Sequence, residues 1–330
     1  MTQSEFLQDL EAFLQEWQND EPTVWVQTSG STGPPKPRQV EKMRMEASAR
    51  LTCSFLGLKE GDSALLCMPL QYIAGKMVVV RSLVAGLNLI PVTPSGHPLK
   101  DMKEAPTFAA MIPMQVYNTL QVPEERAKLM EIKHLIIGGG AIDDSLANEL
   151  KSFPNHVWST YGMTETLSHI ALRRLNGTDA SDWYTPFDNV RIRLSEEGTL
   201  IIHAPNVCAE ELTTNDIAEI NEEGKFRILG RKDNTINSGG VKIQIEQVES
   251  RLKKHINTPF LISARKDAKF GEIVVLIYNK VGNEENIRRI CESELPTYWV
   301  PKAYIAVDEL PMTGTGTPDR ASARQIANGE

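Results

Sequence analysis

The sequence of 330 residues has little that would mark a nucleic-acid partner or a metal centre. Its formal net charge is −8 and its pI is near 5.4. The charges are scattered without a long block of one sign, which argues against DNA or RNA as a partner. The cysteines are far apart, with no CxxC pair and no spacing suited to zinc: Cys53, Cys67, Cys208 and Cys291. Reduced thiols are therefore expected.

Membrane and export signals are also lacking. The N-terminus carries acidic residues where a signal peptide has basic ones. Apolar residues recur there at helical spacing and predict an amphipathic helix: Phe6, Leu7, Leu10, Phe13, Leu14 and Trp17. The longest apolar stretch, residues 77–92, contains Arg81, Gly86 and Asn88 and is too short for a membrane span. We expect a soluble cytoplasmic protein.

Strand and helix signals alternate over the first half of the chain. Strands are expected at residues 24–26, 64–68, 87–92, 108–112, 135–137 and 157–158. Helices are expected at residues 41–56, 75–84 and 114–120, and in a segment that Asp143 caps and that ends near Ser152. This alternation predicts an α/β domain with a largely parallel sheet. Ligands of such sheets bind at the carboxyl ends of the strands.

The pattern changes after about residue 188. Hairpins are expected from residues 190–194 with 199–203 and from 217–220 with 225–229. A smaller unit follows, with a strand at 241–243, a helix through Ile245, Val248 and Leu252, a hairpin over 260–278 and a helix over 284–294. We expect a large domain of residues 1–231 and a small domain of residues 232–330.

Residues 28–37 read Thr-Ser-Gly-Ser-Thr-Gly-Pro-Pro-Lys-Pro and follow a short expected strand. Hydroxyls and backbone N–H groups donate to phosphate oxygens, glycine allows close approach, and lysine adds positive charge. The stretch predicts a phosphate-binding loop of Thr28, Ser29, Gly30, Ser31, Thr32, Gly33 and Lys36. It is not a Walker loop, because Pro37 follows Lys36. A flexible Gly/Ser/Pro linker is the alternative.

A ring, a hydroxyl and a carboxylate lie close together in residues 159–166. Tyr161 can stack on a base, Thr164 can donate to a phosphate, and Glu165 can hold Mg²⁺ through oxygen. An ordinary strand-to-helix turn is the alternative, and structural roles stay open for Met163 and Thr166.

Two further stretches complete a pattern. Residues 230–242 read GRKDNTINSGGVK, and residues 310–316 read LPMTGTG. With residues 28–37 and 161–166, they resemble, in order and over nearly the whole chain, the core motifs of the adenylate-forming superfamily of acyl- and aryl-CoA ligases, peptide-synthetase adenylation domains and luciferases. The resemblance disfavours the linker interpretation. It implies an α/β fold with a large domain of layered sheets and helices and a small mobile α+β C-terminal domain.

Within that superfamily the sequence is most similar to the o-succinylbenzoate–CoA ligase family of menaquinone synthesis. The similarity lies in residues 161–177 and in residues 69–75, which precede Arg81. That family has a longer portion before the phosphate loop, whereas 27 residues stand there in this chain. The resemblance therefore implies a large domain with a truncated N-terminal part.

The resemblance implies a two-step reaction that uses ATP, Mg²⁺ and coenzyme A. A carboxylate attacks the α-phosphate of ATP, and coenzyme A then displaces AMP from the acyl-adenylate. Residues 28–36 would hold the β- and γ-phosphates, Tyr161 and Gly162 would belong to the ATP site with Tyr161 against the adenine, and Thr164 would touch the α-phosphate. Glu165 would bind Mg²⁺.

Other roles follow from the same resemblance. Asp216 stands in Thr-Asn-Asp where the family has Thr-Gly-Asp, and would accept hydrogen bonds from the ribose with Arg231 assisting. A turn residue before a hairpin is the alternative for Asp216. Asp233 falls at the hinge about which the small domain rotates. Gly239 and Gly240 would face the coenzyme A side, or form a turn before a strand.

The C-terminal motif departs from the family. Thr317 occupies the place of the lysine that would reach the carboxylate and the α-phosphate. Loss of such a donor typically costs about a hundred- to a thousandfold in rate. Three explanations compete: a natural sequence whose first step is slow or served by another lysine, an engineered substitution, or a non-catalytic relative. A lesion on an otherwise intact ligase scaffold is favoured, since the ATP-side motifs are present.

The resemblance suggests an acid pocket near Tyr72, Gly139, Gly140 and Ser168, with Arg81 facing the carboxylate that is not activated. The family often has His at the position of Tyr72. Arg81 could instead cap a helix or reach solvent. The leading hypothesis is an acid–CoA ligase acting on o-succinylbenzoate, and the alternatives are a nucleotide-binding relative without turnover or a ligase for another acid.

Two more distant activities rank lower. No carrier domain follows Glu330, as a peptide-synthetase unit would have, and nothing selects luciferase-like oxygenation. The expected partners are a small carboxylic acid, ATP and coenzyme A, with no nucleic acid and no membrane span. A homo-oligomer is left open.

Overall fold

The computed structural model describes residues 1–27, 37–140, 142, 144–312 and 318–329. The chain divides into two compact units. The first comprises Met1–Arg193, Ile201–Leu212 and Ile220–Phe226, and the second Leu194–Leu200, Thr213–Glu219 and Arg227–Glu330. The domain boundary expected between residues 231 and 232 stays a prediction.

Within the described residues of the first unit, a seven-stranded sheet has the order β4-β3-β5-β6-β7-β8-β9. Its strands are β3 (Ser63–Leu66), β4 (Asn88–Pro91), β5 (Phe108–Met111), β6 (His134–Ile137), β7 (His156–Gly162), β8 (His169–Arg174) and β9 (Thr185–Pro186). The strands from β4 to β7 pair in parallel, and β8 and β9 pair antiparallel. The α/β class with a largely parallel sheet is confirmed.

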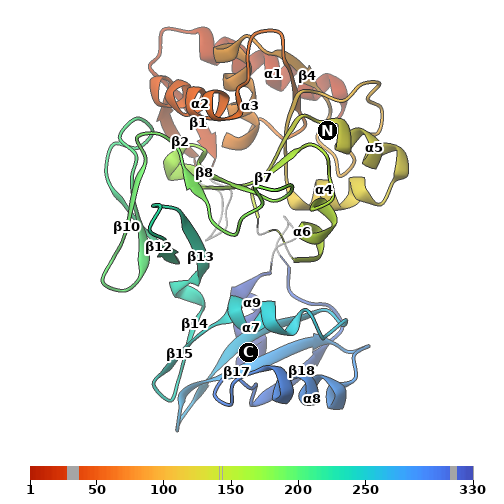
Figure 1. The fold of residues 1–330 in the computed structure, drawn as a ribbon, viewed down its shortest axis with the longest axis vertical. Coiled ribbons are helices and arrows are strands. Elements are labelled where there is room, and N and C mark those ends of the chain that lie inside the picture. Colours follow the sequence, from red (N-terminus) through yellow and green to blue (C-terminus); the bar gives the residue numbers. More distant parts are fainter. Residues whose placement is uncertain (28–36, 141, 143, 313–317, 330) are drawn as a thin grey trace. The chain divides into compact units, whose positions relative to one another are not determined.

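Helices pack around this sheet: α1 (Gln3–Gln18), α2 (Lys42–Leu56), α3 (Ile73–Ala85), α4 (Pro113–Leu120), α5 (Pro123–Glu131) and α6 (Asp144–Leu150). The N-terminal helix is confirmed. It starts with a capping box between Thr2 and Glu5, and it buries Phe6, Leu10 and Phe13. Helices α2 and α3 lie side by side (Figure 1). The residues of β5 and β6 are buried throughout, as expected for parallel strands covered on both faces.

Two smaller sheets follow different patterns. β1 (Thr23–Gln27) pairs antiparallel with β2 (Pro37–Glu41). A four-stranded sheet has the order β10-β11-β12-β13, with β10 (Arg191–Leu194), β11 (Thr199–His203), β12 (Leu212–Ile220) and β13 (Phe226–Arg231). The strands expected near residues 190–203 and 217–229 are confirmed.

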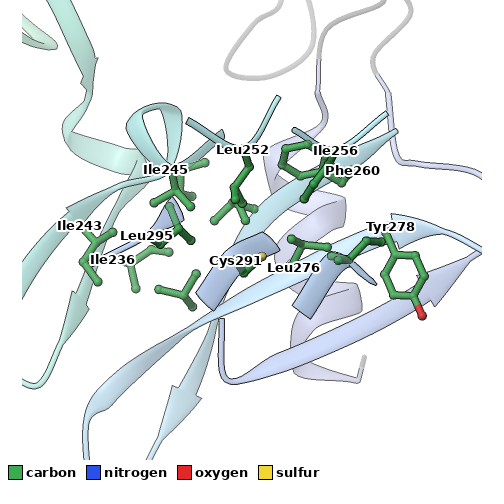
Figure 2. Close-up of a cluster of buried hydrophobic side chains, with 14 of the residues drawn as sticks. Ile236, Ile243, Ile245, Leu252, Ile256, Phe260, Leu276, Tyr278, Cys291 and Leu295 are labelled. Atoms are coloured by element: carbon green, nitrogen blue, oxygen red, sulfur yellow. The ribbon is translucent and has the colours of Figure 1, made fainter. Parts of the chain in front are cut away.

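The C-terminal part of the second unit contains a five-stranded sheet and its own core. The sheet has the order β15-β14-β17-β16, with β18 beside β17. Its elements are β14 (Thr235–Ser238), β15 (Val241–Gln244), α7 (Ile245–Leu252), β16 (Phe260–Asp267), β17 (Gly271–Asn279), α8 (Glu284–Glu294), β18 (Ala303–Val307) and α9 (Arg320–Asn328). Figure 2 shows buried side chains such as Ile243, Leu252, Leu276 and Cys291 converging on one cluster.

The sequence-based assignment of elements was wrong in some places. β7 does not end at residue 158 but continues through Gly162, because Ser159 and Tyr161 keep pairing with β8. The elements β2, α5, β8, β9, β14, β18 and α9 were not expected. Asp143, expected as a helix cap, lies outside the described residues.

Other expectations concern the whole chain. Cys53, Cys67, Cys208 and Cys291 are free thiols. Burial raises the pKa of Cys67 to about 12, which keeps this thiol protonated. In the part of the chain that the structure describes, no helix has the length and apolar character needed to cross a bilayer.

A partly buried ion pair ties α1 to α3. Lys76 Nζ lies 3.1 Å from Glu16 Oε2, donates to the Trp25 carbonyl at 2.6 Å, and sits 4.6 Å from the centre of the Phe13 ring. The Lys76 side chain is 9% exposed. The ammonium therefore depends on Glu16 for its counter-charge, while Glu16 also accepts from the Trp25 N–H at 2.8 Å.

Glu16→Ala is expected to lower the free energy of unfolding by about 2–3 kcal/mol, because it leaves a buried ammonium without its carboxylate. Urea unfolding measures the change. Glu11→Ala on the exposed face of α1 is the control and should change stability by less than about 0.5 kcal/mol. Equal midpoints for the two variants would contradict a stabilising role for the pair.

Candidate functional site

A cavity of about 190 Å³ lies in the first unit where β6 and β7 end. Its described lining consists of Gln27, Met68, Tyr72, Ile73, Ala74, Arg81, Ala110, Met111, Ile112, Ile136, Gly138, Gly139, Thr160, Gly162, Met163, Thr164, Leu167, Ser168 and His169. The lining is mostly apolar, with a few polar groups from several elements. A cavity of this kind at the carboxyl edge of a parallel sheet is a typical small-molecule site.

Arg81 lies in the middle of α3, lines this cavity and is only 2% exposed. Its Nη2 donates to Ser168 Oγ at 2.6 Å, and its Nε has no hydrogen-bond partner among the described residues. Burial lowers the pKa of the guanidinium to about 10, so it stays charged at neutral pH. The expected alternatives, a helix cap or a solvent-exposed arginine, are wrong. The buried Arg81 guanidinium therefore has an unused donor. Among the described residues, no carboxylate lies within ion-pair distance of it.

The turn between β7 and β8 brings Ser168 next to this arginine. Leu167 is buried and has a φ of 64°, a conformation that costs a residue with a side chain on the order of 1–3 kcal/mol. A Cβ on Gly162 would lie 2.3 Å from the Ser168 carbonyl oxygen and 2.4 Å from His169 Cα. The chain therefore needs glycine at 162 for the two strands to approach.

His169 connects Ser168 to the helix α2. Its Nδ1 lies 3.2 Å from Ser168 Oγ, and its Nε2 lies 3.0 Å from Thr52 Oγ1. The ring packs edge-on against Phe187 at 5.5 Å. Burial, and then the Arg81 charge, hold the pKa of His169 well below its usual range. The imidazole is therefore neutral.

The structure brings several predicted residues to one cavity. Tyr72, Gly139 and Ser168 line it together with Arg81, whereas Gly140 is exposed and is not among the lining residues.

The predicted ATP-side residues of the same unit lie in or beside this cavity. Gly162 and Thr164 line it, and Glu165 lies exposed in the short 3₁₀ helix Thr164–Thr166. Tyr161 is half-buried, with its ring 5.0 Å from that of Phe226. Thr166 is buried and bonds the backbone of Met163 and Ser168, a structural role.

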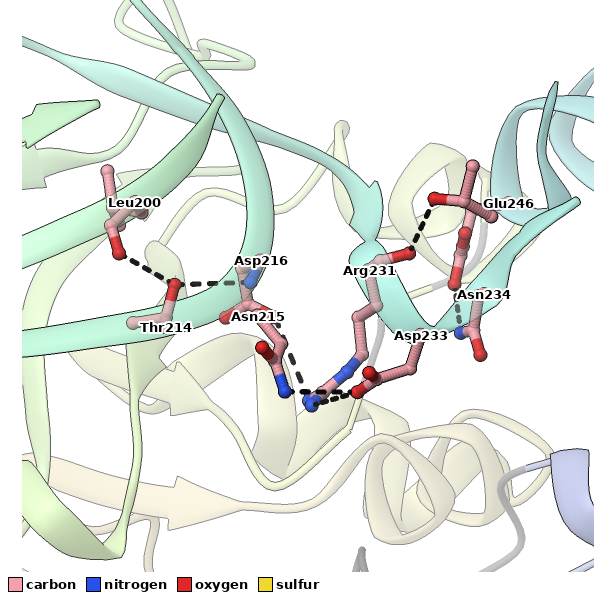
Figure 3. Close-up of polar contacts among 9 residues, drawn as sticks. Leu200, Thr214, Asn215, Asp216, Arg231, Asp233, Asn234 and Glu246 are labelled. Atoms are coloured by element: carbon pink, nitrogen blue, oxygen red, sulfur yellow. Dashed lines mark hydrogen bonds and ion pairs between the residues drawn. The ribbon is translucent and has the colours of Figure 1, made fainter. Parts of the chain in front are cut away.

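The second unit holds another polar cluster (Figure 3). Asp216 lies inside β12, so its interpretation as a turn residue before a hairpin is wrong. An Asp216 carboxylate oxygen lies 3.7 Å from Arg231 Nη1. Thr214 Oγ1 accepts from the Asp216 N–H at 3.1 Å and donates to the Leu200 carbonyl at 2.8 Å. The Asp216 side chain is 15% exposed, so its carboxylate lies at the edge of solvent beside the Arg231 guanidinium.

Asp233 belongs to the short 3₁₀ helix Lys232–Asn234. Its Oδ2 accepts from Asn215 Nδ2 at 3.1 Å and from Arg231 Nη2 at 3.4 Å (Figure 3). Gly239 and Gly240 have φ values of 59° and 85° and connect β14 to β15. They form the turn before a strand, a conformation that glycine adopts without strain.

Some predicted residues cannot be placed. Residues 28–36, the expected phosphate loop, and Thr317 lie outside the described residues. The described residues contain no group of three or more His, Cys, Asp or Glu side chains that could hold a metal ion. A Mg²⁺ bound through substrate phosphates needs only one or two protein carboxylates, and the exposed Glu165 fits that requirement.

No sequence pattern assigns a role to His169, Thr52 or Asn215. His169 stands directly after Ser168, so its proximity could have been noted, but Thr52 is 117 positions away. Only the packing of α2 against the start of β8 brings the two together.

Residues 3–208 match the sequence family described as AMP-binding enzyme. The 2-succinylbenzoate–CoA ligase of Bacillus mycoides (strain KBAB4) is 27% identical over 352 residues, covering 96% of this chain and 73% of that protein. The corresponding ligase of Bacillus cereus (strain Q1) gives the same values.

Two solved structures give the fold comparison. The acyl-CoA synthetase (AMP-forming)/AMP-acid ligase II-like protein of Dyadobacter fermentans is 31% identical, with a TM-score of 0.68 over 99% of this chain and 96% of that one. The o-succinylbenzoate coenzyme A synthetase of Bacillus subtilis, solved with its acyl-adenylate intermediate, is 23% identical. Its TM-score is 0.76 over 93% of this chain and 69% of that one.

Gly162→Ala is expected to cost about 3 kcal/mol or more of unfolding free energy, because the new Cβ meets backbone atoms that cannot rotate away. Guanidinium chloride unfolding measures it. Gly96→Ala is the control, since the nearest atom there is the end of the flexible Asn118 side chain, and it should cost less than about 1 kcal/mol. A stable Gly162→Ala protein would show that the turn before β8 can move.

Proposed function

Because the chain belongs to the AMP-binding enzyme family, we propose that it is an AMP-forming acid–CoA ligase whose acid substrate is 2-succinylbenzoate. The 2-succinylbenzoate–CoA ligases of Bacillus, similar over nearly the whole chain, support this assignment. The relative from Dyadobacter fermentans, which this chain covers almost completely, supports the AMP-forming class.

The observation that carries the substrate proposal is the buried Arg81. A guanidinium buried without a carboxylate is costly, and an anionic ligand group would offset that cost. Its Nε has no partner among the described residues, so a donor remains for a ligand. 2-Succinylbenzoate carries two carboxylates, one of which is activated. The other fits against Arg81, and the apolar walls of the cavity suit the aromatic ring.

The proposed chemistry has two steps. In the first, an oxygen of the acid carboxylate attacks the α-phosphorus of ATP, and the bond from that phosphorus to the bridging oxygen breaks to release pyrophosphate. In the second, the sulfur of coenzyme A attacks the acyl carbon, the bond from that carbon to the AMP oxygen breaks, and AMP leaves. The thiol proton passes to solvent. Both steps bring negative groups together, so fixed positive charges and donors must be in place beforehand.

The ATP-side residues are assigned by the family resemblance. Residues 28–36 hold the β- and γ-phosphates, Tyr161 and Gly162 border the adenine, and Thr164 touches the α-phosphate. The position of Thr164 on the cavity wall supports its role. Glu165 is the ligand for Mg²⁺, which when bound neutralises phosphate charge.

The ribose and hinge roles rest on the second cluster. The Asp216 carboxylate accepts from the ribose hydroxyls, and Arg231 Nη1 lies 3.7 Å from a carboxylate oxygen of Asp216. Asp233 is the hinge residue, and its exposed position in a short 3₁₀ helix is compatible with a change in φ and ψ. Gly239 and Gly240 face coenzyme A in the second step.

A second candidate function is nucleotide binding without turnover, and one observation favours it. Thr317 stands where the family lysine would reach the α-phosphate and the carboxylate. A short neutral hydroxyl replaces a long cationic side chain, so the first step would be slow. A protein of this second kind would bind ATP but release no pyrophosphate.

Arg81→Met is expected to raise the KM for 2-succinylbenzoate about 10- to 100-fold, since a charge-assisted hydrogen bond contributes about 1.5–3 kcal/mol. The KM for ATP should not change. Stability should be unchanged or higher, because an uncompensated buried charge is removed. Steady-state kinetics and urea unfolding measure the three quantities. An acid KM equal to that of the unaltered protein would rule out Arg81 as the anchor.

The Thr317→Lys variant should release pyrophosphate from 2-succinylbenzoate and ATP about a hundred- to a thousandfold faster than the unaltered chain. Pyrophosphate release and coenzyme A ester formation are followed in parallel for both. Equal rates would mean that another residue activates the phosphate. The absence of turnover in both, with ATP binding retained, would favour the binding protein.

A further inference from the structure

Arg81 is the start of a hydrogen-bond chain that runs from the cavity into the packed interior of the first unit. Arg81 Nη2 contacts Ser168 Oγ at 2.6 Å, and Ser168 Oγ contacts His169 Nδ1 at 3.2 Å. His169 Nε2 contacts Thr52 Oγ1 at 3.0 Å, and Thr52 Oγ1 contacts the Ser48 carbonyl oxygen at 3.3 Å. Four of the five residues are less than 9% exposed, and Ser168 is half-buried.

The direction of every hydrogen bond in this chain follows from its two ends. A guanidinium only donates, so Ser168 Oγ accepts from Arg81. A carbonyl oxygen only accepts, so Thr52 gives its single hydrogen to Ser48. Thr52 then has only lone pairs for His169.

The middle of the chain is thereby fixed. His169 must carry its hydrogen on Nε2 in order to donate to Thr52, which leaves Nδ1 as an acceptor. Ser168 gives its hydrogen to this Nδ1. The imidazole is neutral, because burial and the Arg81 charge oppose its protonation.

We propose that His169 is a positioning residue that orients the Ser168 hydroxyl and, through it, holds the Arg81 guanidinium in place for the free carboxylate of the substrate. This inference rests on the proposed function for the identity of that carboxylate. Since the one hydrogen of Ser168 points to His169, Ser168 offers the cavity an acceptor and no donor. A ligand carboxylate therefore binds Arg81 and is not attracted by Ser168. Of these two residues, only Arg81 selects an acid with a second negative group.

The first test does not depend on any activity. In protein labelled with ¹⁵N-histidine, the His169 ring signals are identified by their loss in His169→Asn. They should show the Nε2–H neutral tautomer from about pH 5.5 to about pH 8. A hydrogen on Nδ1, or an imidazolium in that range, would overturn the proposed direction of the chain.

The second test separates the two nitrogens of the ring. In His169→Asn the side-chain Oδ1 takes roughly the place of Nδ1 and can accept from Ser168. In His169→Gln the amide reaches the place of Nε2, so the bond to Thr52 is kept and the bond to Ser168 is lost. The Gln variant should raise the KM for 2-succinylbenzoate about tenfold, the effect of about one hydrogen bond. The Asn variant should stay within about twofold.

The readouts distinguish positioning from a general structural effect. kcat, the KM for ATP and the KM for an aromatic acid with a single carboxylate should be the same in both variants. Equal acid KM values for the Asn and Gln variants, or a parallel rise in the KM for ATP, would overturn the proposal. If the unaltered chain and Thr317→Lys use no acid at all, the proposed ligase function fails, and the role of His169 toward a substrate carboxylate fails with it. The tautomer measurement still decides whether His169 orients Ser168 and, through it, Arg81.

Discussion

The burial of one guanidinium without a matching carboxylate constrains the rest of this site. Desolvation of Arg81 opposes folding, and a single bond from Nη2 to Ser168 compensates only part of it. An acidic residue beside Arg81 would stabilise the folded chain more, yet it would also neutralise the cation and remove the attraction for a ligand anion. The described residues place hydroxyls and a neutral imidazole there instead. The desolvation cost of Arg81 that the folded chain leaves uncompensated can be offset when an anionic ligand binds.

The same constraint explains the strained turn before β8. Ser168 reaches Arg81 only because Leu167 adopts a positive φ and because β7 and β8 approach so closely at Gly162. The pairing register of the two strands shifts between Tyr161 and Gly162. Strain of this kind persists where the surrounding structure holds it, and here β7, β8 and α3 surround it. The proposed adenine contact Tyr161 and the acid anchor Arg81 are thus linked through one short segment.

Much of the architecture could be predicted from the sequence because long apolar or alternating runs dominate it. The helix α8 was predicted with its observed bounds, and most strands of the parallel sheet within two residues. The helix α9 was missed because its buried residues are the small Ala323 and Ala327, which leave little apolar periodicity. β14 buries alternate residues, but one of them is Ser238, so its sequence Thr-Ile-Asn-Ser shows no apolar alternation. β2 is mostly exposed and has no such alternation either.

The site was predictable as a set of motifs but not as a geometry. The residue types of Tyr72, Gly139, Ser168 and Arg81 could be carried over from a family resemblance, whereas burial of Arg81 depends on the packing of α2, α3 and β8. The bond from His169 to Thr52 joins elements far apart in sequence, and no local pattern contains it. Long-range contacts of this kind follow from the fold as a whole.

A neutral histidine suits the position beside Ser168 better than any charged residue would. An aspartate or glutamate would orient Ser168 but would also cancel the Arg81 field, while a lysine would repel the guanidinium. Asparagine or glutamine can satisfy one neighbour at a time. The imidazole reaches Ser168 and Thr52 from opposite sides of one rigid ring, so it orients the arginine without neutralising it. The chain thereby keeps a buried positive charge both ordered and available.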